Sequence, residues 1–407
     1  MPALKSAGEG IRTRRRMMGR HVLVAGQIAL SMVLLIVAGL FLDGFRGIFE
    51  TRPGFRTDHL IGMDLDPSVF RRAPEQTYDF YRKLLDRVRA VPGVESAGMA
   101  EVLPYAPNQS LVTVVPEGYR FPKGREKVTV FGEAVDGNYF STMDVAIVRG
   151  RGFSPGDRGG SSRPVAVVNQ EFAATYWPNS DPMGRRFRLD RPDGPAIEVV
   201  GVAKTGSYLF PAEPPRPYVY LPYDQNRRPH MTVIAESYGD PAALAAPMRD
   251  AVRGLDADLP VLNLRTMAAH LKRVRSNYLV FVQTYTAMAL VGLILAMTGL
   301  YGLISYSVSR RIPEIGVRMA IGASRADVAR LVLRQGLILA GAGIAIGGVL
   351  AAFAAPALAS GFLGRGTRHV ATWIVIPLGL LLASVTACYL PARRASSLDP
   401  IRALRHD

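Results

Sequence analysis

The sequence contains the run HVLVAGQIALSMVLLIVAGLF at His21–Phe41, which carries no Asp, Glu, Lys or Arg. A helix needs about 20 apolar residues to cross a bilayer, and this run is long enough. Three further charge-free runs follow, at Tyr278–Val308, Gly336–Ser360 and Trp373–Ala392. The four runs predict four transmembrane helices, because a buried helix of that length in a soluble protein normally keeps a charged edge.

The first run is longer than the roughly 7 to 15 apolar residues of a secretory signal, and no small-residue cleavage pattern follows it. An uncleaved anchor is therefore expected. Residues 42–277, between the first and second runs, alternate helical and strand patterns. Pro74–Val91 has apolar residues at helical spacing, whereas Val128–Phe131, Pro164–Val168 and Ile197–Val202 are rich in β-branched residues. The expected fold is an integral membrane protein with four transmembrane α-helices and a large α+β extracytoplasmic domain inserted between helices 1 and 2.

The net charge of +16 is concentrated beside the predicted helices. Residues 1–20 hold six basic residues against one acidic, residues 309–335 hold six against two, and residues 393–407 hold four against two. With four spans these three segments lie on one side of the membrane, and the positive-inside rule makes that side the cytoplasm. We therefore expect a multi-pass membrane protein with both termini cytoplasmic. Because the charge is divided among juxtamembrane segments, nucleic-acid binding is not expected.

No pattern in the sequence indicates catalysis. The chain lacks a Gly-x-x-x-x-Gly-Lys-Ser/Thr phosphate loop, its six histidines show no metal-ligand spacing, and no Gly-x-Ser-x-Gly turn presents a nucleophile. The single cysteine, Cys388, lies in the last run, so no internal disulfide can form. We expect no enzyme activity and no cofactor or metal.

The basic segment of residues 309–335, here called the elbow, carries the clearest functional pattern. Glu314–Ile321 is short and amphipathic, Gly322 permits a break, and Ser324 with Asp327 resembles a capping box that starts the next helix. The elbow either lies on lipid headgroups or docks as a coupling helix into a partner. The candidate coupling residues are Glu314, Ile315, Gly316, Arg318, Met319, Gly322, Ala323 and Asp327.

Two further sets of residues predict helix packing inside the membrane. Gln27 and Ser31 share one face of the first span, where an interhelical hydrogen bond is favoured over contact with a substrate. Gly343 and Gly347 belong to a row of small residues along the third span, which permits close approach of another helix.

Several motifs resemble known families. The segments Glu314–Ala323, Gly299–Ser307 and Pro391–Arg405 resemble the FtsX-like permease domain, which assigns residues 278–407 to it. Asn138–Phe140, Gly150–Phe153, Tyr176–Pro178, Asp181–Gly184 and Val199–Val202 resemble the MacB-type periplasmic core, which assigns residues 42–277 to it. The resemblance extends over nearly the whole chain from about Arg20, and it is strongest to one unit of the duplicated permeases of acidobacteria.

The resemblance implies the permease subunit of an ABC transporter. Such a subunit lies in a bacterial inner membrane and converts the closure of a cytoplasmic ATPase dimer into movement outside the membrane. The expected process is efflux or export of a molecule that the sequence does not identify. The implied partners are the ATPase, a second permease unit, a membrane-fusion protein and the lipid bilayer. The second unit is either a fused half or another copy of this chain. The alternative function is a membrane regulator that activates a periplasmic partner such as a cell-wall hydrolase.

The expected organisation follows from these observations. The chain divides into a cytoplasmic tail (1–20), helix 1 (21–41), the periplasmic core (42–277), three further helices (278–308, 336–360 and 373–392) and a cytoplasmic tail (393–407). The elbow lies between the second and third helices.

Overall fold

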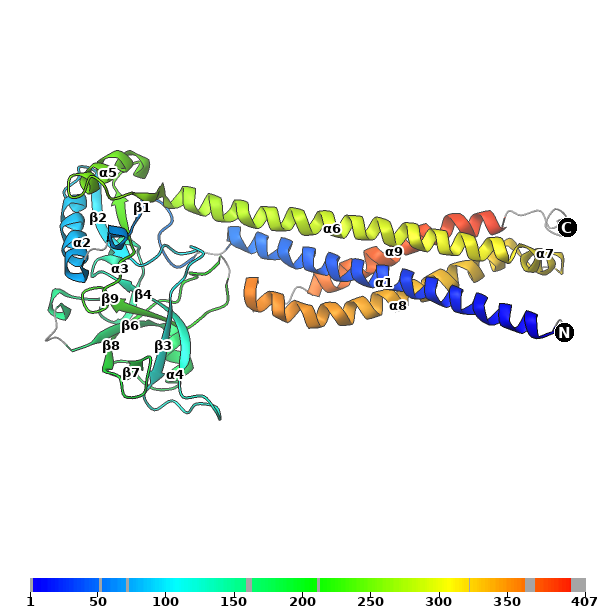
Figure 1. Cartoon of the computed structure of the whole chain (residues 1–407), viewed down its shortest axis with the longest axis horizontal. Helices are drawn as coiled ribbons and strands as arrows, with labels where there is room; N and C mark the ends of the chain where they lie inside the picture. Colours follow the sequence, from blue (N-terminus) through cyan, green and yellow to red (C-terminus); the bar gives the residue numbers. More distant parts are fainter. Residues whose placement is uncertain are drawn as a thin grey trace. The chain divides into compact units, whose positions relative to one another are not determined.

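The computed structural model describes residues 3–50, 53–70, 73–158, 163–210, 213–321, 323–362 and 370–396. Within these residues four helices are long and apolar enough to cross a membrane, which confirms the predicted number of spans. They belong to α1 (Ala3–Glu50), α6 (Met267–Arg310), α8 (Arg325–Phe362) and α9 (Val370–Ser396) (Figure 1). The chain forms two compact units, residues 1–46 with 277–407 and residues 47–276. Each unit is described by itself below.

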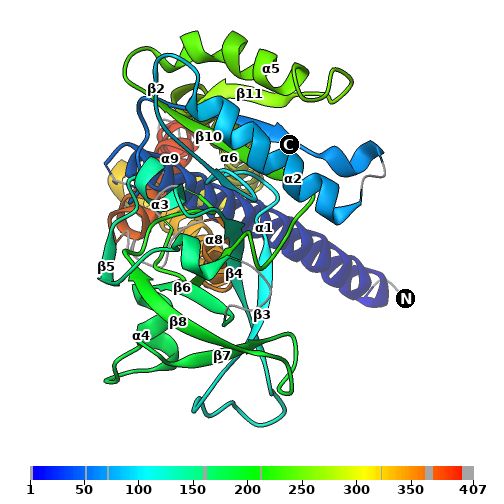
Figure 2. The same ribbon diagram turned by 90° about the vertical axis from the view of Figure 1, so that its left-hand side faces the viewer.

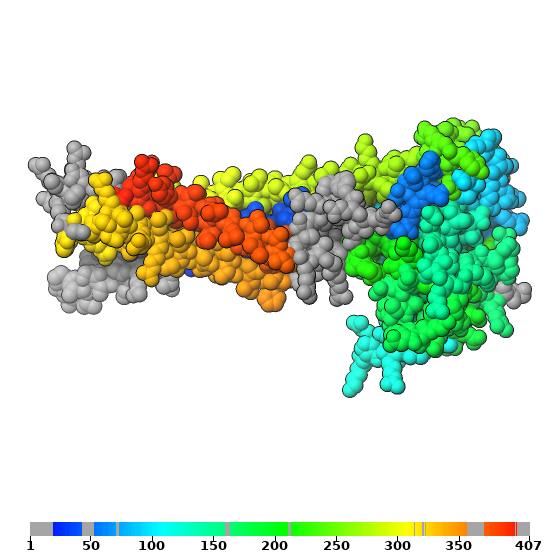
Figure 3. All heavy atoms as spheres, turned by 180° about the vertical axis from the view of Figure 1, so that it is seen from behind, coloured from blue at the N-terminus to red at the C-terminus, as the bar shows by residue number. Residues whose placement is uncertain are grey.

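In the helical unit, α1 contacts each of the other three long helices. A Cβ atom built on Gly39 of α1 would lie 2.7 Å from Thr372 of α9. One built on Gly299 of α6 would lie 2.5 Å from the Oε1 atom of Gln27, and one on Gly343 of α8 would lie 2.7 Å from Ile28. Helices α8 and α9 also run side by side, as Figure 3 shows in orange and red. Small residues thus bring these helices close enough for their backbones to pack.

The outer unit is an α+β domain built on one eleven-stranded sheet. Its strands are β1 (Leu60–Leu65), β2 (Val94–Ala100), β3 (Leu111–Pro116), β4 (Val128–Val135), β5 (Ile147–Gly150), β6 (Val165–Asn169), β7 (Arg186–Leu189), β8 (Ala196–Ala203), β9 (Tyr218–Pro222), β10 (Met231–Ser237) and β11 (Leu262–Thr266). Its α-helices are α2 (Pro74–Arg89), α3 (Tyr139–Thr142), α4 (Gln170–Tyr176) and α5 (Ala245–Arg253), and its short 3-10 turns are Pro67–Phe70, Pro155–Asp157 and Pro241–Leu244. The predicted strands at residues 128–131, 164–168 and 197–202 correspond to β4, β6 and β8.

One part of the sheet, the open half, has the order β11-β1-β10-β2. Helices α2 and α5 cover one face, where Tyr81 and Leu84 of α2 and Met248 of α5 pack on Met63 and Val233 of the sheet. Figure 2 shows α2, α5 and β11 together at one end of this unit. The amphipathic spacing of α2 accounts for its position, because its buried residues recur every three or four positions.

The other part, the barrel half, closes on itself. Strands β4-β3-β7-β8-β6-β9 pair in that order, and β9 pairs again with β4 through Phe131↔Tyr218 to Val135↔Pro222. Its interior is filled by valines of the strands and by Phe172 and Trp177 of the α4 region. Strand β4 joins the two halves, since it also pairs with β2 at Ala100↔Val135.

Candidate functional site

The elbow contains a short helix, α7 (Ile312–Ala320), between two long ones. Helix α6 ends at Arg310 and α7 begins at Ile312, after the single residue Arg311, with a proline in its first turn where no intrahelical N–H bond is required. Helix α8 begins at Arg325. Short connections therefore separate α7 from the long helix on either side of it.

One face of α7 is packed into the helical unit. Ile315 is 4% exposed and lies in the same apolar cluster as Val328 and Val332 of α8, with Met319 packed beside them. Gly316 is also buried. The sequence pattern places Ile315, Gly316 and Met319 among the candidate coupling residues, and the structure directs them toward the other helices of this unit.

The opposite face of α7 is exposed. The Arg318 guanidinium donates to the Glu314 carboxylate at 2.7 Å, and both side chains are about half exposed. Val317 is 46% exposed, and Ile321, directly after the helix, is 81% exposed. These two apolar residues were not among the predicted candidates, although they continue the i, i+3, i+4, i+7 series that starts at Glu314.

The start of α8 is capped as the sequence predicts. The hydroxyl of Ser324 donates to Asp327 Oδ2 at 2.6 Å, and the backbone N–H of Asp327 donates to Ser324 Oγ at 3.2 Å. The N–H of Ala323 donates to the carbonyl of Arg318 at 3.0 Å, which ties the connection back to α7. Gly322 lies outside the described residues.

One of the two predicted sets of packing residues lies on α1 itself, and the other lies where α8 contacts α1. A Cβ atom on Gly343 or Gly347 would lie within 3 Å of α1 backbone and side-chain atoms, so α8 approaches α1 closely there. The hydrogen bond expected across helices from Ser31 is not formed, because its hydroxyl donates to the Gln27 carbonyl of its own helix at 2.8 Å. The Oε1 atom of Gln27 is buried without a described hydrogen-bond partner.

Arginines contact two tyrosines near the end of α6. The guanidinium of Arg20 lies 4.6 Å from the ring centre of Tyr306, and that of Arg310 lies 5.8 Å from it. Arg394 of α9 donates to the hydroxyl of Tyr301 at 3.0 Å. Arg20, Arg310 and Arg394 come from the three basic segments that the sequence pattern predicts on one side of the membrane.

In the outer unit the most deeply buried acid is Glu133 of β4, which is 2% exposed. The Tyr139 hydroxyl donates to it at 3.4 Å and the N–H of Val102 at 3.5 Å. Burial raises the pKa of this carboxyl to about 8, so it is mostly protonated at neutral pH. No sequence pattern marked Glu133, because its burial depends on strand pairings distant in the chain.

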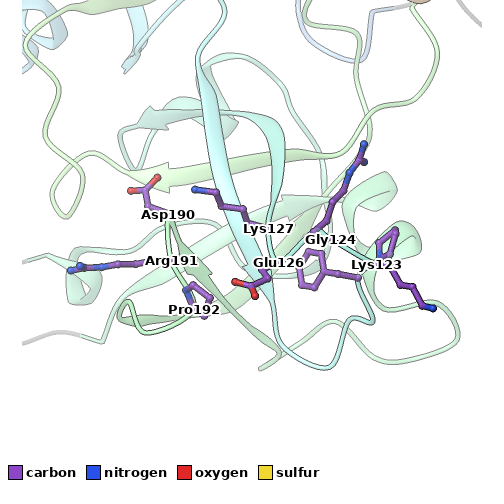
Figure 4. A pocket seen from close by; sticks show the side chains of 10 residues that line it. Lys123, Gly124, Glu126, Lys127, Asp190, Arg191 and Pro192 are labelled. Atoms are coloured by element: carbon purple, nitrogen blue, oxygen red, sulfur yellow. The ribbon is translucent and has the colours of Figure 1, made fainter.

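A wide surface hollow of about 710 Å³ lies between the β3–β4 and β7–β8 loops. Lys123 to Lys127 come from the first loop and Asp190, Arg191 and Pro192 from the second (Figure 4). The hollow is open and charged. Within the described residues, no group of three or more His, Cys, Asp or Glu side chains is placed to hold a metal.

Comparison with known proteins relates both units to families. The model of the MacB-like periplasmic core domain matches residues 22–251, more than half of the chain, and the model of the FtsX-like permease C-terminal domain matches residues 286–400. The chain belongs to the MacB/FtsX-type permease family. The elbow of this MacB/FtsX-type permease lies within the FtsX-like match, and both halves of its sheet lie mostly within the MacB-like match.

Individual relatives are more distant. A macrolide export ATP-binding/permease protein MacB of Paracoccus denitrificans is 28% identical over 66% of this chain and 40% of its own length. The ABC transporter permease YknZ of Bacillus subtilis is 25% identical over 71% of this chain and 72% of its own length. The MacB/FtsX-type permease thus spans about two fifths of that MacB protein. The crystal structure of the periplasmic region of MacB from Actinobacillus actinomycetemcomitans covers 56% of this chain and 98% of its own, with 14% identity and a TM-score of 0.37.

Proposed function

We propose that the chain is the membrane subunit of an ABC transporter and couples ATP hydrolysis on a separate cytoplasmic ATPase to movement of its outer domain. The observation that supports this role is the two-faced helix α7. Its inner face is packed with Ile315 and Met319, while Glu314, Val317, Arg318 and Ile321 face away from the helical unit. A short helix held in this way can receive a displacement on one face and pass it to the helices behind it.

The composition of the exposed face favours a protein partner over lipid headgroups. A helix that lies on anionic headgroups presents several basic side chains and a net positive charge. The exposed face of α7 instead carries one acidic and one basic side chain, which pair with each other, beside two exposed apolar residues. Apolar side chains beside a hydrogen-bonded charge pair match the core and rim of a protein interface.

We also propose an orientation in the membrane, a direction of transport and a set of partner subunits. With the elbow in the cytoplasm, both termini are cytoplasmic and the outer domain faces the periplasm. The name of the Paracoccus relative, a macrolide export protein, supports export as the direction. A second permease unit completes the complex, and a membrane-fusion protein is the expected periplasmic partner.

The test is ATP turnover of the chain in nanodiscs with the ATPase purified from the same membranes. Glu314→Lys should lower the permease-stimulated rate at least tenfold, because an unpaired charge buried against a partner costs about 2 to 5 kcal/mol. Membrane insertion and expression should not change, since the side chain is half exposed in the chain alone.

A charge exchange separates docking from local helix stability. Glu314→Arg combined with Arg318→Glu rebuilds the pair within α7, which is worth only about 0.3 to 0.5 kcal/mol when exposed. If α7 docks, the exchanged protein stays inactive. Recovery of the full rate would show that the pair acts only within its helix and would reject the proposal. Arg334→Gln, at an exposed position of α8, is the matched control and should keep the rate.

A further inference from the structure

Helices α1 and α6 run antiparallel and contact each other over most of their membrane-spanning lengths (Figure 1). At one end of this seam the ring of Phe41 stacks on that of Tyr285, with 4.9 Å between the ring centres. At the other end the guanidinium of Arg20 lies over the ring of Tyr306. The α1–α6 seam therefore ends on Arg20 and Tyr306, where the membrane-spanning part of α6 stops.

Two arginines at this end lie at the boundary between the hydrocarbon core and the lipid headgroups. Arg20 directly precedes the charge-free run His21–Phe41, and Arg310 follows the run Tyr278–Val308 after one residue. Long basic side chains at such positions keep their charged ends at the level of the headgroups. Both guanidinium groups are therefore within reach of the phosphates of the membrane.

The same two arginines share one aromatic ring. Their guanidinium carbons lie 4.6 and 5.8 Å from the ring centre of Tyr306, so these carbons are no more than about 10 Å apart. A guanidinium within about 6 Å of a ring centre is attracted by the face of the ring. Tyr306 thus holds a cation of α1 and a cation of α6 close together.

No acidic side chain in the described part of the chain forms an ion pair with either arginine. Two acids of the elbow already have other partners, since Glu314 accepts from Arg318 at 2.7 Å and Asp327 accepts from the Ser324 hydroxyl at 2.6 Å. Like charges held close together repel each other, and an anion between them would remove that repulsion. Guanidinium groups bind phosphate through paired N–H···O hydrogen bonds, so a phosphate suits this position.

The surface one turn deeper in the membrane is apolar and open. Leu23, three residues after Arg20, is 64% exposed. Gly302, four residues before Tyr306, is also exposed, and a Cβ atom built on it would meet no atom within 4 Å. Residues three or four apart share a helix face, so both positions continue the arginine-bearing surface toward the hydrocarbon. This surface leaves room for an acyl chain below the two cations.

We propose that this end of the α1–α6 seam binds an anionic phospholipid. The phosphate accepts from the guanidinium groups of Arg20 and Arg310, and the acyl chains lie on Leu23 and in the space beside Gly302. Phosphatidylcholine would bring its own cation to the same place, so a lipid of net negative charge such as phosphatidylglycerol is favoured. The bound lipid bridges α1 and α6 where their cations would otherwise repel each other.

The test measures lipid binding to the full chain in a neutral detergent without any ATPase, so its outcome is independent of the coupling proposal. Native mass spectrometry at rising lipid concentration gives the dissociation constant of the first bound lipid. Phosphatidylglycerol should bind at least about fivefold more tightly than phosphatidylcholine with the same acyl chains. An excess of inorganic phosphate should not displace it, because the ion has no acyl chains. Equal binding of the two lipids, or displacement by inorganic phosphate, would reject a phospholipid site.

Variants assign the binding to this pair of arginines. Arg20→Gln and Arg310→Gln should each weaken phosphatidylglycerol binding about fivefold, which is the usual contribution of one basic residue beside an anionic lipid. Arg393→Gln is the matched control, because Arg393 is exposed and also directly follows a charge-free run, and it should keep the wild-type affinity. Thermal unfolding checks that each variant is folded.

Two results with folded variants would overturn the proposal. Undiminished binding after Arg20→Gln and Arg310→Gln would leave these cations to an acidic protein partner. An equal loss in all three variants would mean that the lipid responds to net charge and not to this pair.

Discussion

At the residue scale, the environment of a polar side chain decides its role, and sequence spacing gives only part of that environment. The capping pair Ser324 and Asp327 was predictable because both partners lie within one turn. Ser31 was predicted to bond across helices but bonds within its own, since a serine hydroxyl in a helix can reach the carbonyl four residues earlier. Glu133 has no such local signature.

Glu133→Gln should change how the stability of the outer domain depends on pH. The folded-state pKa of Glu133, about 8, lies above the ordinary value of 4.5. The folded state therefore holds its proton more tightly, and this residue lowers the free energy of unfolding as pH rises from about 4.5 to 8. Glutamine is neutral at every pH, so the variant should not lose unfolding free energy in this way as pH rises. It should therefore be more stable than the wild type at pH 8, by about 4 kcal/mol at most.

The measurement is urea unfolding of the full chain in detergent between pH 5 and 8. Trp177, in the barrel half, is the fluorescent reporter after Trp373 is replaced by Phe. Glu95→Gln, at an exposed position of β2, should keep the wild-type slope. Equal pH slopes for Glu133→Gln and wild type would contradict the assignment of a raised pKa.

At the element scale, the long helices and several strands follow from local composition, whereas the closure of the barrel half does not. Charge-free runs predict the spans, and β-branched runs predict β4, β6 and β8. The parallel pairing of β4 with β9 joins residues about 90 positions apart, and no short-range pattern encodes it. The outward face of α7 was likewise only partly predicted, because the burial of Ile315 and Met319 depends on α8.

Gly347→Ala tests the packing of α8 on α1. The added Cβ atom would lie 2.6 Å from the Ala29 carbonyl oxygen and 2.6 Å from the Met32 Cβ atom. Moving backbone atoms to relieve this clash costs energy, so overpacking should lower the unfolding free energy by about 1 to 3 kcal/mol. Thermal unfolding in detergent would measure this as a lower midpoint.

The matched control is Gly341→Ala on the same helix, whose added Cβ atom meets no atom within 4 Å. It should keep the wild-type midpoint or raise it slightly, because alanine favours helix more than glycine does. Equal effects of both substitutions would indicate that helix propensity, and not contact with α1, determines the result.

At the scale of the whole molecule, the coupling proposal requires a defined orientation in the membrane. After Cys388 is replaced by Ala, a cysteine at Lys123 should react with an impermeant maleimide added to intact spheroplasts. A cysteine at Ser309 should react only after permeabilisation. Both positions are exposed, so accessibility of the side chain does not limit the reaction. The opposite labelling pattern would place the elbow outside and would remove the basis of the coupling proposal.

The strand order of the outer unit constrains the order in which its parts can fold as the chain is synthesised. Strand β10 lies between β1 and β2, and β11 completes the pairing of β1, yet both follow the barrel half in the sequence. All six barrel strands therefore emerge before β1 gains its first neighbour in the sheet. The barrel half can close early, while β1 and the edge of β2 that pairs with β10 stay unpaired until the end of the domain has been synthesised. Unpaired strand edges make a folding intermediate prone to aggregation, so slow delivery of residues 231–266 would prolong the interval in which this domain can aggregate.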